Sequence, residues 1–246
     1  MKKDGGKSKK PGLGKTTGPS GRGLSVRVKT AKKRTSSSTW WLGRQLNDPY
    51  VLEAKKLGYR SRAAFKILQL DEKFHFLKPG ARVVDLGAAP GGWTQIAASK
   101  VLKSGPKGVQ GKVVGIDILP MDPVPGATVL HLDFTLDEAP GRLMALLDGP
   151  ADVVLSDMAA SATGHTQTDH IKIVYLAELA LDFACRVLAP GGIFIAKVLQ
   201  GGAESQLLAA LKRHFTTVKH VKPEASRKES AEIYVVALGF RGEKAG

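Results

Sequence analysis

The chain has 246 residues, of which 43% are hydrophobic, and a formal net charge of +15. That length suits one domain with a tail and a core of ordinary size. The one cysteine, Cys185, excludes an internal disulfide, and the sequence holds no Cys-x-x-Cys motif for zinc. No apolar stretch approaches the roughly 18 residues of a membrane span, and no hydrophobic signal core opens the chain. We therefore expect a cytoplasmic monomer with no membrane partner.

The positive charge is concentrated at the start of the chain. Residues 1–40 carry net +11, because they hold twelve lysines and arginines but one acid, Asp4, whereas the other 206 residues carry net +4. Residues 1–38 are rich in Gly, Lys, Ser and Thr and poor in apolar side chains. This predicts a disordered basic tail before a domain over residues 39–241. The charge favours a polyanionic partner, nucleic acid first, and a solubilising tail is the alternative.

Helical patterns come first along the chain, and strands follow. Apolar residues recur at helical spacing between residues 48 and 77, and Lys78-Pro79-Gly80 ends that pattern. Beyond it, unbroken apolar runs alternate with helical patterns. The predicted helices cover residues 93–102, 136–147, 171–188 and 203–214, and the predicted strands cover residues 82–86, 112–118, 128–132, 152–156, 193–198, 218–221 and 233–238.

This alternation predicts the fold. Strands that are continuous apolar runs separated by helices belong to a mostly parallel sheet with helices on both faces. No helix fits between the last two strands, so we expect the seventh to run antiparallel beside the sixth. The predicted fold is α/β and Rossmann-like with a seven-stranded sheet, and ligands in such folds bind at the carboxyl ends of the parallel strands.

The first strand ends in a glycine-rich turn, Gly87-Ala88-Ala89-Pro90-Gly91-Gly92-Trp93. Glycines in such a turn let the backbone approach a ligand closely and take dihedral angles that other residues resist. Nicotinamide oxidoreductases use a similar turn. The spacing here is not G-x-G-x-x-G, however, and Pro90 lacks the amide that a pyrophosphate would bind. The turn therefore favours a different nucleoside ligand.

Two acids follow at the same edge of the predicted sheet. Asp117 ends the second strand, 30 residues after Gly87, where a carboxylate can accept both ribose hydroxyls of an adenosine. Asp133 follows the third strand, in position for an adenine amino group. A cap or solvated strand end would also explain Asp117, and a turn would also explain Asp133. Acids and glycines gathered at one edge predict a nucleoside cofactor.

Four further ionisable side chains converge at this edge by topology. The fourth strand leads into Asp157, the fifth carries Lys197, and an antiparallel seventh strand would begin at Glu232. Lys66, on the helix before the first strand, can complete the set. An ordinary ion-pair cluster is the alternative interpretation.

Two lysines and two acids suit methyl transfer to an alcohol. A ribose hydroxyl is a weak nucleophile and must lose its proton as it takes a methyl group from a sulfonium. A lysine accepts that proton only in its neutral form, which a second ammonium nearby favours and carboxylates oppose. We therefore expect Lys197 to be the base, with Lys66 close by and the two carboxylates holding it in place.

Six segments resemble the FtsJ/RrmJ (RlmE) family, in the family's order and spacing over residues 36–240. The resemblance implies a methyltransferase fold, S-adenosylmethionine as cofactor, and 2′-O-methylation of a uridine ribose in ribosomal RNA of the large subunit. The segments are Ser61-Arg62-Ala63-Ala64-Phe65-Lys66, residues 85–93, Asp117-Ile118-Leu119-Pro120-Met121-Asp122-Pro123, Ser156-Asp157-Met158-Ala159, Lys197-Val198-Leu199-Gln200-Gly201 and Glu232-Ile233-Tyr234.

The resemblance also implies roles for the site residues. Two positions depart from the family pattern: Ala160 stands where proline is common, which bears on the loop over the substrate, and Ala64 stands where an aromatic is common. Lys197 would be the proton acceptor. The catalytic tetrad would be Lys66, Asp157, Lys197 and Glu232, and the residues that contact S-adenosylmethionine would be Gly91, Trp93, Asp117, Asp133 and Asp157.

Residues outside the tetrad suggest how RNA would approach. Trp40, Trp41 and Tyr50 could stack on bases or pack in the core. His165 and His170 lie in the loop after the fourth strand, and because no third ligand is near them we expect no metal site. A basic track toward Lys66 is predicted over Arg44, Lys55, Lys56, Arg60 and Arg62.

Three other functions are alternatives for this sequence. A non-catalytic RNA-binding factor for ribosome assembly could share the fold, but it would not need an intact tetrad. The glycine spacing disfavours a nicotinamide oxidoreductase. A 2′-O-methyltransferase for transfer RNA, a messenger RNA cap or another RNA stays open, because its chemistry would be identical.

Overall fold

The computed structural model describes residues 30, 35–160, 163–201 and 205–242. Most of the predicted basic tail therefore lies outside the described residues. Three helices come first, α1 (Ser36–Leu46), α2 (Pro49–Lys56) and α3 (Ala63–Phe74). The side chain of Thr35 accepts a hydrogen bond from the Ser38 amide and so caps α1, which begins three residues before the predicted domain start.

Strands and helices then alternate as the sequence predicts. Each predicted strand and helix is present, and its ends lie within five residues of the prediction. The elements are β1 (Arg82–Leu86), α4 (Gly92–Val101), the 3-10 helix η2 (Pro106–Gly108), β2 (Lys112–Asp117), β3 (Thr128–His131), α5 (Glu138–Leu147), β4 (Ala151–Ser156), α6 (Thr166–Val187), β5 (Leu188–Leu199), α7 (Ser205–His214), β6 (Phe215–Val221) and β7 (Glu232–Phe240).

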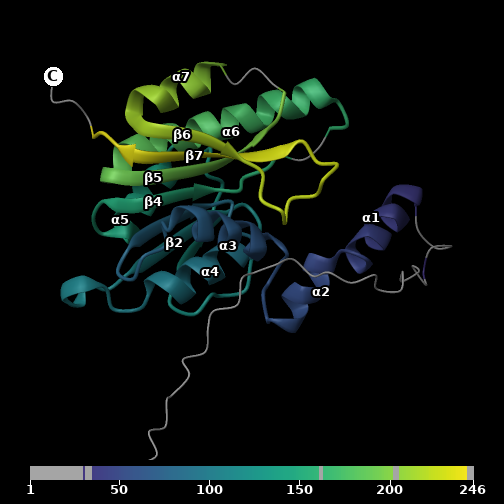
Figure 1. Ribbon diagram of the computed structural model, residues 1–246, viewed down its shortest axis with the longest axis horizontal. Helices are drawn as coiled ribbons and strands as arrows, with labels where there is room; N and C mark the ends of the chain where they lie inside the picture. Colours follow the sequence, from purple (N-terminus) through teal and green to yellow (C-terminus); the bar gives the residue numbers. More distant parts are fainter. Residues whose placement is uncertain (1–29, 31–34, 161–162, 202–204, 243–246) are drawn as a thin grey trace, which may run out of the picture.

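The seven strands form one sheet in the order β3-β2-β1-β4-β5-β7-β6 (Figure 1). β1 pairs in parallel with β2 and β4, β2 with β3, and β4 with β5, whereas β7 pairs antiparallel with both β5 and β6. The predicted α/β fold, mostly parallel with an antiparallel last strand, is confirmed. β7 lies beside β6 as expected, and its position between β5 and β6 also places Tyr234 opposite Lys197.

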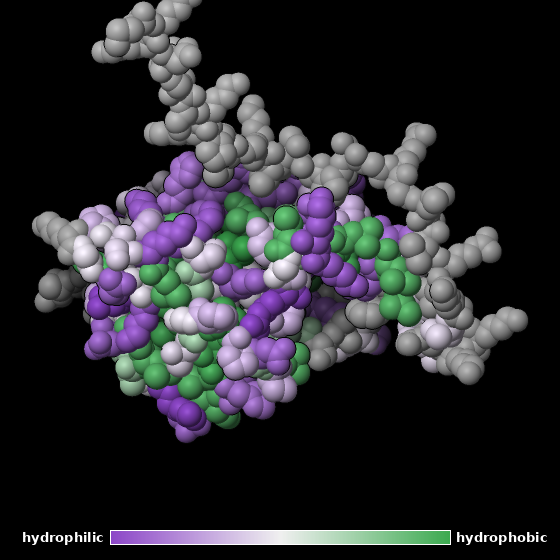
Figure 2. Space-filling model, turned by 90° about the horizontal axis from the view of Figure 1, so that it is seen from below, coloured by the Kyte–Doolittle hydropathy of each residue, from purple (hydrophilic) through white to green (hydrophobic). Residues whose placement is uncertain are grey.

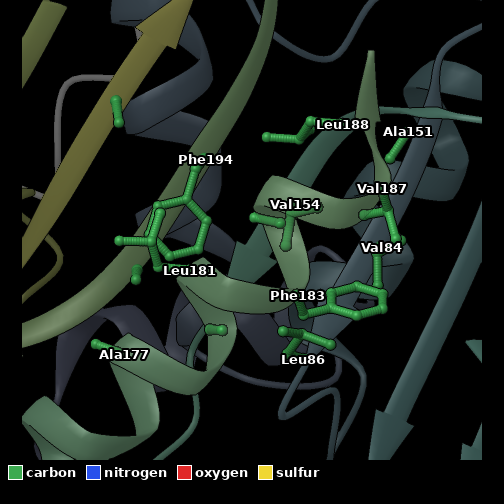
Figure 3. Close-up of a cluster of buried hydrophobic side chains, with 14 of the residues drawn as sticks. Val84, Leu86, Ala151, Val154, Ala177, Leu181, Phe183, Val187, Leu188 and Phe194 are labelled. Carbon is green, nitrogen blue, oxygen red and sulfur yellow. The ribbon is translucent and has the colours of Figure 1, made fainter. Parts of the chain in front are cut away.

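Helices cover both faces of the sheet because the strands are apolar on both sides. Successive side chains of a strand point to opposite faces. Val84 and Leu86 of β1 therefore pack with α5, α6 and α7, while Val83 packs with α3 and α4. Figure 3 shows the first cluster, where Leu181 and Phe183 of α6 meet side chains of the central strands.

The first two helices stand apart from the layered body. In Figure 1, α1 and α2 lie to one side of the sheet, near the end at which β7 begins. On the face shown in Figure 2, hydrophobic residues form several separate patches among hydrophilic ones. Within the described ranges, no helix is both long enough and apolar enough to cross a membrane.

Candidate active site

The four predicted catalytic residues meet at the carboxyl edge of the parallel strands. Asp157 directly follows β4, Lys197 lies near the end of β5, and Glu232 begins the antiparallel β7. Lys66 reaches the same place from α3, whose first residues follow the loop after α2. Four elements far apart in sequence thus deliver one cluster of charged groups.

Hydrogen bonds connect the cluster into a chain. Lys66 Nζ lies 2.7 Å from Glu232 Oε1 and donates to Tyr234 Oη at 3.0 Å. Tyr234 Oη donates in turn to Asp157 Oδ1 at 2.8 Å. Lys197 Nζ donates to Asp157 at both the backbone oxygen, 2.6 Å away, and Oδ1, 3.1 Å away. One hydrogen-bonded network therefore holds both lysines, with Tyr234 and Asp157 between them.

Tyr234 is the member that sequence reasoning missed. The segment Glu232-Ile233-Tyr234 is part of the family resemblance, which assigns a role to its glutamate but none to its tyrosine. Side chains two residues apart on a strand share a face, so Tyr234 had to point to the same side as Glu232. That period of two is the signal that could have found it.

Charge and burial shape the protonation of this network. Burial opposes ionisation of Asp157, but Lys197 and Lys66, with the hydrogen bond from Tyr234, hold the pKa of Asp157 below its ordinary value. Burial, together with Asp157 and Glu232, raises the pKa of Tyr234 well above its ordinary value. The tyrosine therefore stays a neutral donor to Asp157, and Asp157 stays a carboxylate.

The glycine turn after β1 brings its backbone close to β4. Gly87 has φ 81° and Gly91 has φ 102°, both in the left-handed region that favours glycine. A Cβ atom on Gly87 would lie 2.8 Å from the backbone of Met158, which follows Asp157. The absence of a side chain here therefore lets the turn lie directly beside the tetrad.

A cavity of about 270 Å³ opens on the other side of this turn. Gly87, Asp117 and Asp133 line it, as do Phe134 and Met158. Two acids and the glycine turn, which the sequence predicted to meet, are therefore brought to one cavity. Met158 joins that cavity to the tetrad.

Both acids are also used by the protein itself. Asp117 Oδ2 accepts from the Ala89 amide and Oδ1 from the Leu119 amide, each at 2.8 Å. Asp133 Oδ1 accepts from the amide and hydroxyl of Thr135, which is the turn considered as its alternative. Each carboxylate oxygen has two lone pairs, so both acids keep acceptor capacity toward the cavity.

Two residues near the turn are buried away from it. The side chain of Trp93 is 3% exposed, donates through Nε1 to the Ala63 carbonyl at 2.9 Å and packs against Tyr234. The structure thus places the side chain of this predicted cofactor contact in the core, and Trp93 is not among the residues that line the cavity. Asp85 of β1 is fully buried and accepts from Thr94 Oγ1 at 2.6 Å, and burial raises its pKa to about 7.

A second hollow, of about 370 Å³, lies on the far side of Lys66 and Glu232. Arg44, Arg62 and Arg227 line it together with Glu229 and Glu232. Arg44 pairs with Glu229 at 2.8 Å, so charges of both signs surround this approach to the tetrad.

The predicted basic track is only partly free for RNA. Arg60 donates its guanidinium to the carbonyls of Asp122 and Pro123 and so fastens the loop after β2. Arg62 forms an ion pair with Asp48 at 2.8 Å. Lys55 and Lys56 are exposed on α2.

The remaining predictions concern three aromatic side chains that could stack on RNA bases and a metal site at the histidines. The ring of Tyr50 packs on Phe65 at a centroid distance of 5.2 Å, so its contact is within the protein. The side chains of Trp40 and Trp41 lie outside the described parts. In the described part of the chain, no three His, Cys, Asp or Glu residues gather as a metal site would require.

Comparison with known proteins identifies the family. The sequence model of the FtsJ-like methyltransferase family matches residues 59–240. The chain belongs to this family. The match confirms the resemblance that the six segments indicate, and it covers every residue of the tetrad.

Relatives of the same family match over nearly the whole chain. Ribosomal RNA large subunit methyltransferase E of Paramagnetospirillum magneticum is 66% identical over 237 residues, 95% of this chain and 97% of the relative. The protein of that name from Parvibaculum lavamentivorans is 60% identical over 244 residues, 98% and 94% of the two chains. The solved structure of a ribosomal RNA methyltransferase from Plasmodium falciparum matches with a TM-score of 0.64 at 31% identity, covering 75% of this chain and 100% of that one.

Proposed function

We propose that this methyltransferase uses S-adenosylmethionine to methylate the 2′-hydroxyl of a uridine ribose in ribosomal RNA of the large subunit. The observation that carries the proposal is the connected network from Glu232 through Lys66, Tyr234 and Asp157 to Lys197. It lies next to a cavity lined by two acids and a glycine turn. An alcohol acceptor needs such a proton-handling group next to the methyl donor.

The residues around the cavity fit the cofactor. Asp117 offers carboxylate acceptors to the ribose hydroxyls of the adenosine, and Asp133 offers one to the adenine amino group. Gly87 lines the cavity and, without a side chain, would leave the turn open to the amino-acid part. Gly91, the other predicted glycine contact, is not among the lining residues, because Arg60 and Met121 fill the space beside it. When bound, S-adenosylmethionine supplies an electrophilic methyl group on a sulfonium.

The side chains of the tetrad would then handle the proton. Lys197, in its neutral form, would accept it from the ribose hydroxyl at Nζ, the atom that lies within hydrogen-bond distance of two oxygens of Asp157. Lys66, fixed by Glu232 and Tyr234, would add a second cation beside the acceptor. With its lysine 9% exposed, the site would also restrict water at the reacting hydroxyl.

The relatives' names support the choice of RNA, since both high-identity relatives are named for the large-subunit ribosomal RNA. In this proposal residues 39–241 form the catalytic domain, working as a monomer on the large subunit. The basic tail, residues 1–38, would add affinity for RNA that does not depend on sequence.

The test is to offer the purified chain S-adenosylmethionine with large subunits, free ribosomal RNA or transfer RNA. Modified nucleosides are then identified by mass spectrometry and placed in the sequence. We expect 2′-O-methyluridine at one position of large-subunit ribosomal RNA. Methylation of a base, or of transfer RNA alone, would overturn the proposed acceptor, and binding of NADH but not S-adenosylmethionine would overturn the cofactor.

A further inference from the structure

Asp48 is a buried acid outside the tetrad that ties three segments together. It caps α2, accepting from the Tyr50 amide at 3.0 Å, and its side chain is 8% exposed. The same carboxylate takes an ion pair from Arg62 Nη1 at 2.8 Å and a longer one from Arg227 Nε at 3.4 Å. Arg62 precedes α3, and Arg227 lies in residues 222–231, the loop between β6 and β7.

Further contacts fix this loop on α3. Arg62 donates to the Ala225 carbonyl, and the Ala225 amide donates to Gln69 Oε1 at 2.8 Å. Ala225 is fully buried. The next residue, Ser226, donates its hydroxyl to Glu232 Oε1 at 2.9 Å. The loop therefore passes from α3 directly to the carboxylate of the tetrad.

The ion pair between Lys66 and Glu232 bridges the same two segments. Lys66 lies one helical turn after Arg62, and Glu232 lies five residues after Arg227. Glu232 directly follows the loop as the first residue of β7, so a movement of the loop away from α3 that displaces Glu232 would lengthen its 2.7 Å contact with Lys66. The Asp48 carboxylate pairs with one arginine from each segment, Arg62 before α3 and Arg227 in the loop between β6 and β7.

The negative charge of Asp48 is needed to hold the two positive charges of Arg62 and Arg227 next to each other. Burial lowers the pKa of Arg62, Asp48 acts against this effect, and the neighbouring Arg227 adds to it. Two guanidinium groups that share one acid repel each other once the acid is gone. In addition, Arg62 Nε and Arg227 Nη2 are buried without a hydrogen-bond partner within the described structure. These two nitrogen atoms therefore make no hydrogen bond that could hold the arginines in place without Asp48.

We propose that Asp48 is a positioning residue for the reaction, holding Arg62 and Arg227 together so that Lys66 and Glu232 stay in contact. This inference rests on the proposed function, because the contact matters to catalysis only if the tetrad is catalytic. Asp48 touches neither the cavity nor the reacting groups. Its effect should therefore fall on turnover and leave cofactor affinity unchanged.

The first variant is Asp48→Asn, which removes the charge but keeps a residue that caps helices well. A misplacement of about 1 Å can cost about 10²-fold in rate, so we expect kcat for methylation of large subunits to fall by about 10- to 100-fold. The Kd for S-adenosylhomocysteine, measured by calorimetry, should stay within about twofold, because Asp117 and Asp133 are untouched.

A matched control separates positioning from lost stability. Asp71 is also buried, accepts from the Leu77 amide at 2.7 Å and pairs with Lys100. Asp71→Asn therefore removes the same kind of group, here a buried carboxylate on α3, away from the loop between β6 and β7. It should lower the melting temperature as Asp48→Asn does, with kcat within about twofold of wild type.

The closing experiment is rescue. Adding Arg227→Gln to Asp48→Asn removes one of the two repelling cations, and kcat should recover by at least about threefold relative to Asp48→Asn alone. If Asp48→Asn does not fold, Arg227→Gln alone should lower kcat without changing the Kd. A full kcat in the folded Asp48→Asn protein, the absence of rescue, or an equal kcat loss in Asp71→Asn would each overturn the inference. A wild-type protein that methylates no RNA would instead overturn the proposed function, and this inference with it.

Discussion

The buried carboxyl of Asp85 predicts a pH dependence of stability that one substitution should remove. Burial raises its pKa to about 7 from 3.8, so the native state keeps a proton on Asp85 at pH values where the unfolded chain has lost it. That contribution to stability is complete below about pH 4 and is lost as the pH rises through about 7. At about 1.36 kcal/mol per pKa unit, the difference between the unfolded and native pKa values of Asp85 corresponds to about 4 kcal/mol of folding stability. The side chain is fully buried, so solvent does not screen it.

The perturbation is Asp85→Asn, whose amide does not titrate and whose oxygen can still accept from Thr94 Oγ1. Urea denaturation of both proteins between about pH 4 and pH 8 gives the free energies of unfolding, and other titrating groups cancel in their difference. The variant should gain about 4 kcal/mol relative to wild type across this range. Thr94→Val is the control: it removes the hydroxyl that lowers the pKa of Asp85, so its decline should extend to higher pH. A difference that is flat with pH would refute the reasoning.

Three predictions concern the cofactor, the base and the tail. Lys197→Arg keeps the charge but cannot deprotonate, so the rate of single-turnover methylation should fall by about 10²–10⁴-fold. The calorimetric Kd for S-adenosylhomocysteine should stay almost unchanged, and a substantially active variant would contradict the role of Lys197 as the base. Asp117→Ala removes a charged acceptor worth about 1.5–3 kcal/mol, and the same calorimetry should show binding weakened by at least about tenfold, whereas equal affinity would exclude Asp117 from the cofactor site. Deleting residues 1–34, which keeps the Thr35 cap, should make the slope of log RNA affinity against log salt concentration less steep, while the methylated nucleotide stays the same. Methylation of a different nucleotide would mean that the tail determines specificity.

Three members of the tetrad could be predicted because they stand at the ends of strands. Adjacent parallel strands must share a carboxyl edge, so a sequence that yields β4 and β5 also brings Asp157 near Lys197. Glu232 required only the direction of β7. Asp117 and the glycine turn met at a cavity for the same reason, through the pairing of β1 with β2.

Contacts made by loops could not be predicted in this way. Asp48 before Pro49 has the sequence of an ordinary helix cap, and nothing near it indicates that Arg62 and Arg227 converge on its carboxylate. Their meeting depends on where residues 222–231 fold back on α3. Trp93 was likewise predicted at the cofactor from its place in a motif, while its large apolar ring is buried against Tyr234.

The same distinction explains why charge alone did not locate the RNA path. A guanidinium carries five donors in a fixed plane, so it can satisfy the carbonyls of a loop as well as the oxygens of a phosphate. Arg60 binds the loop carbonyls of Asp122 and Pro123. The sequence alone does not show whether an arginine binds a loop or a phosphate, but its hydrogen-bond partners do. A basic residue near a site thus indicates RNA when its donors face solvent, which keeps Lys55 and Lys56 as candidates and gives Arg60 a structural role.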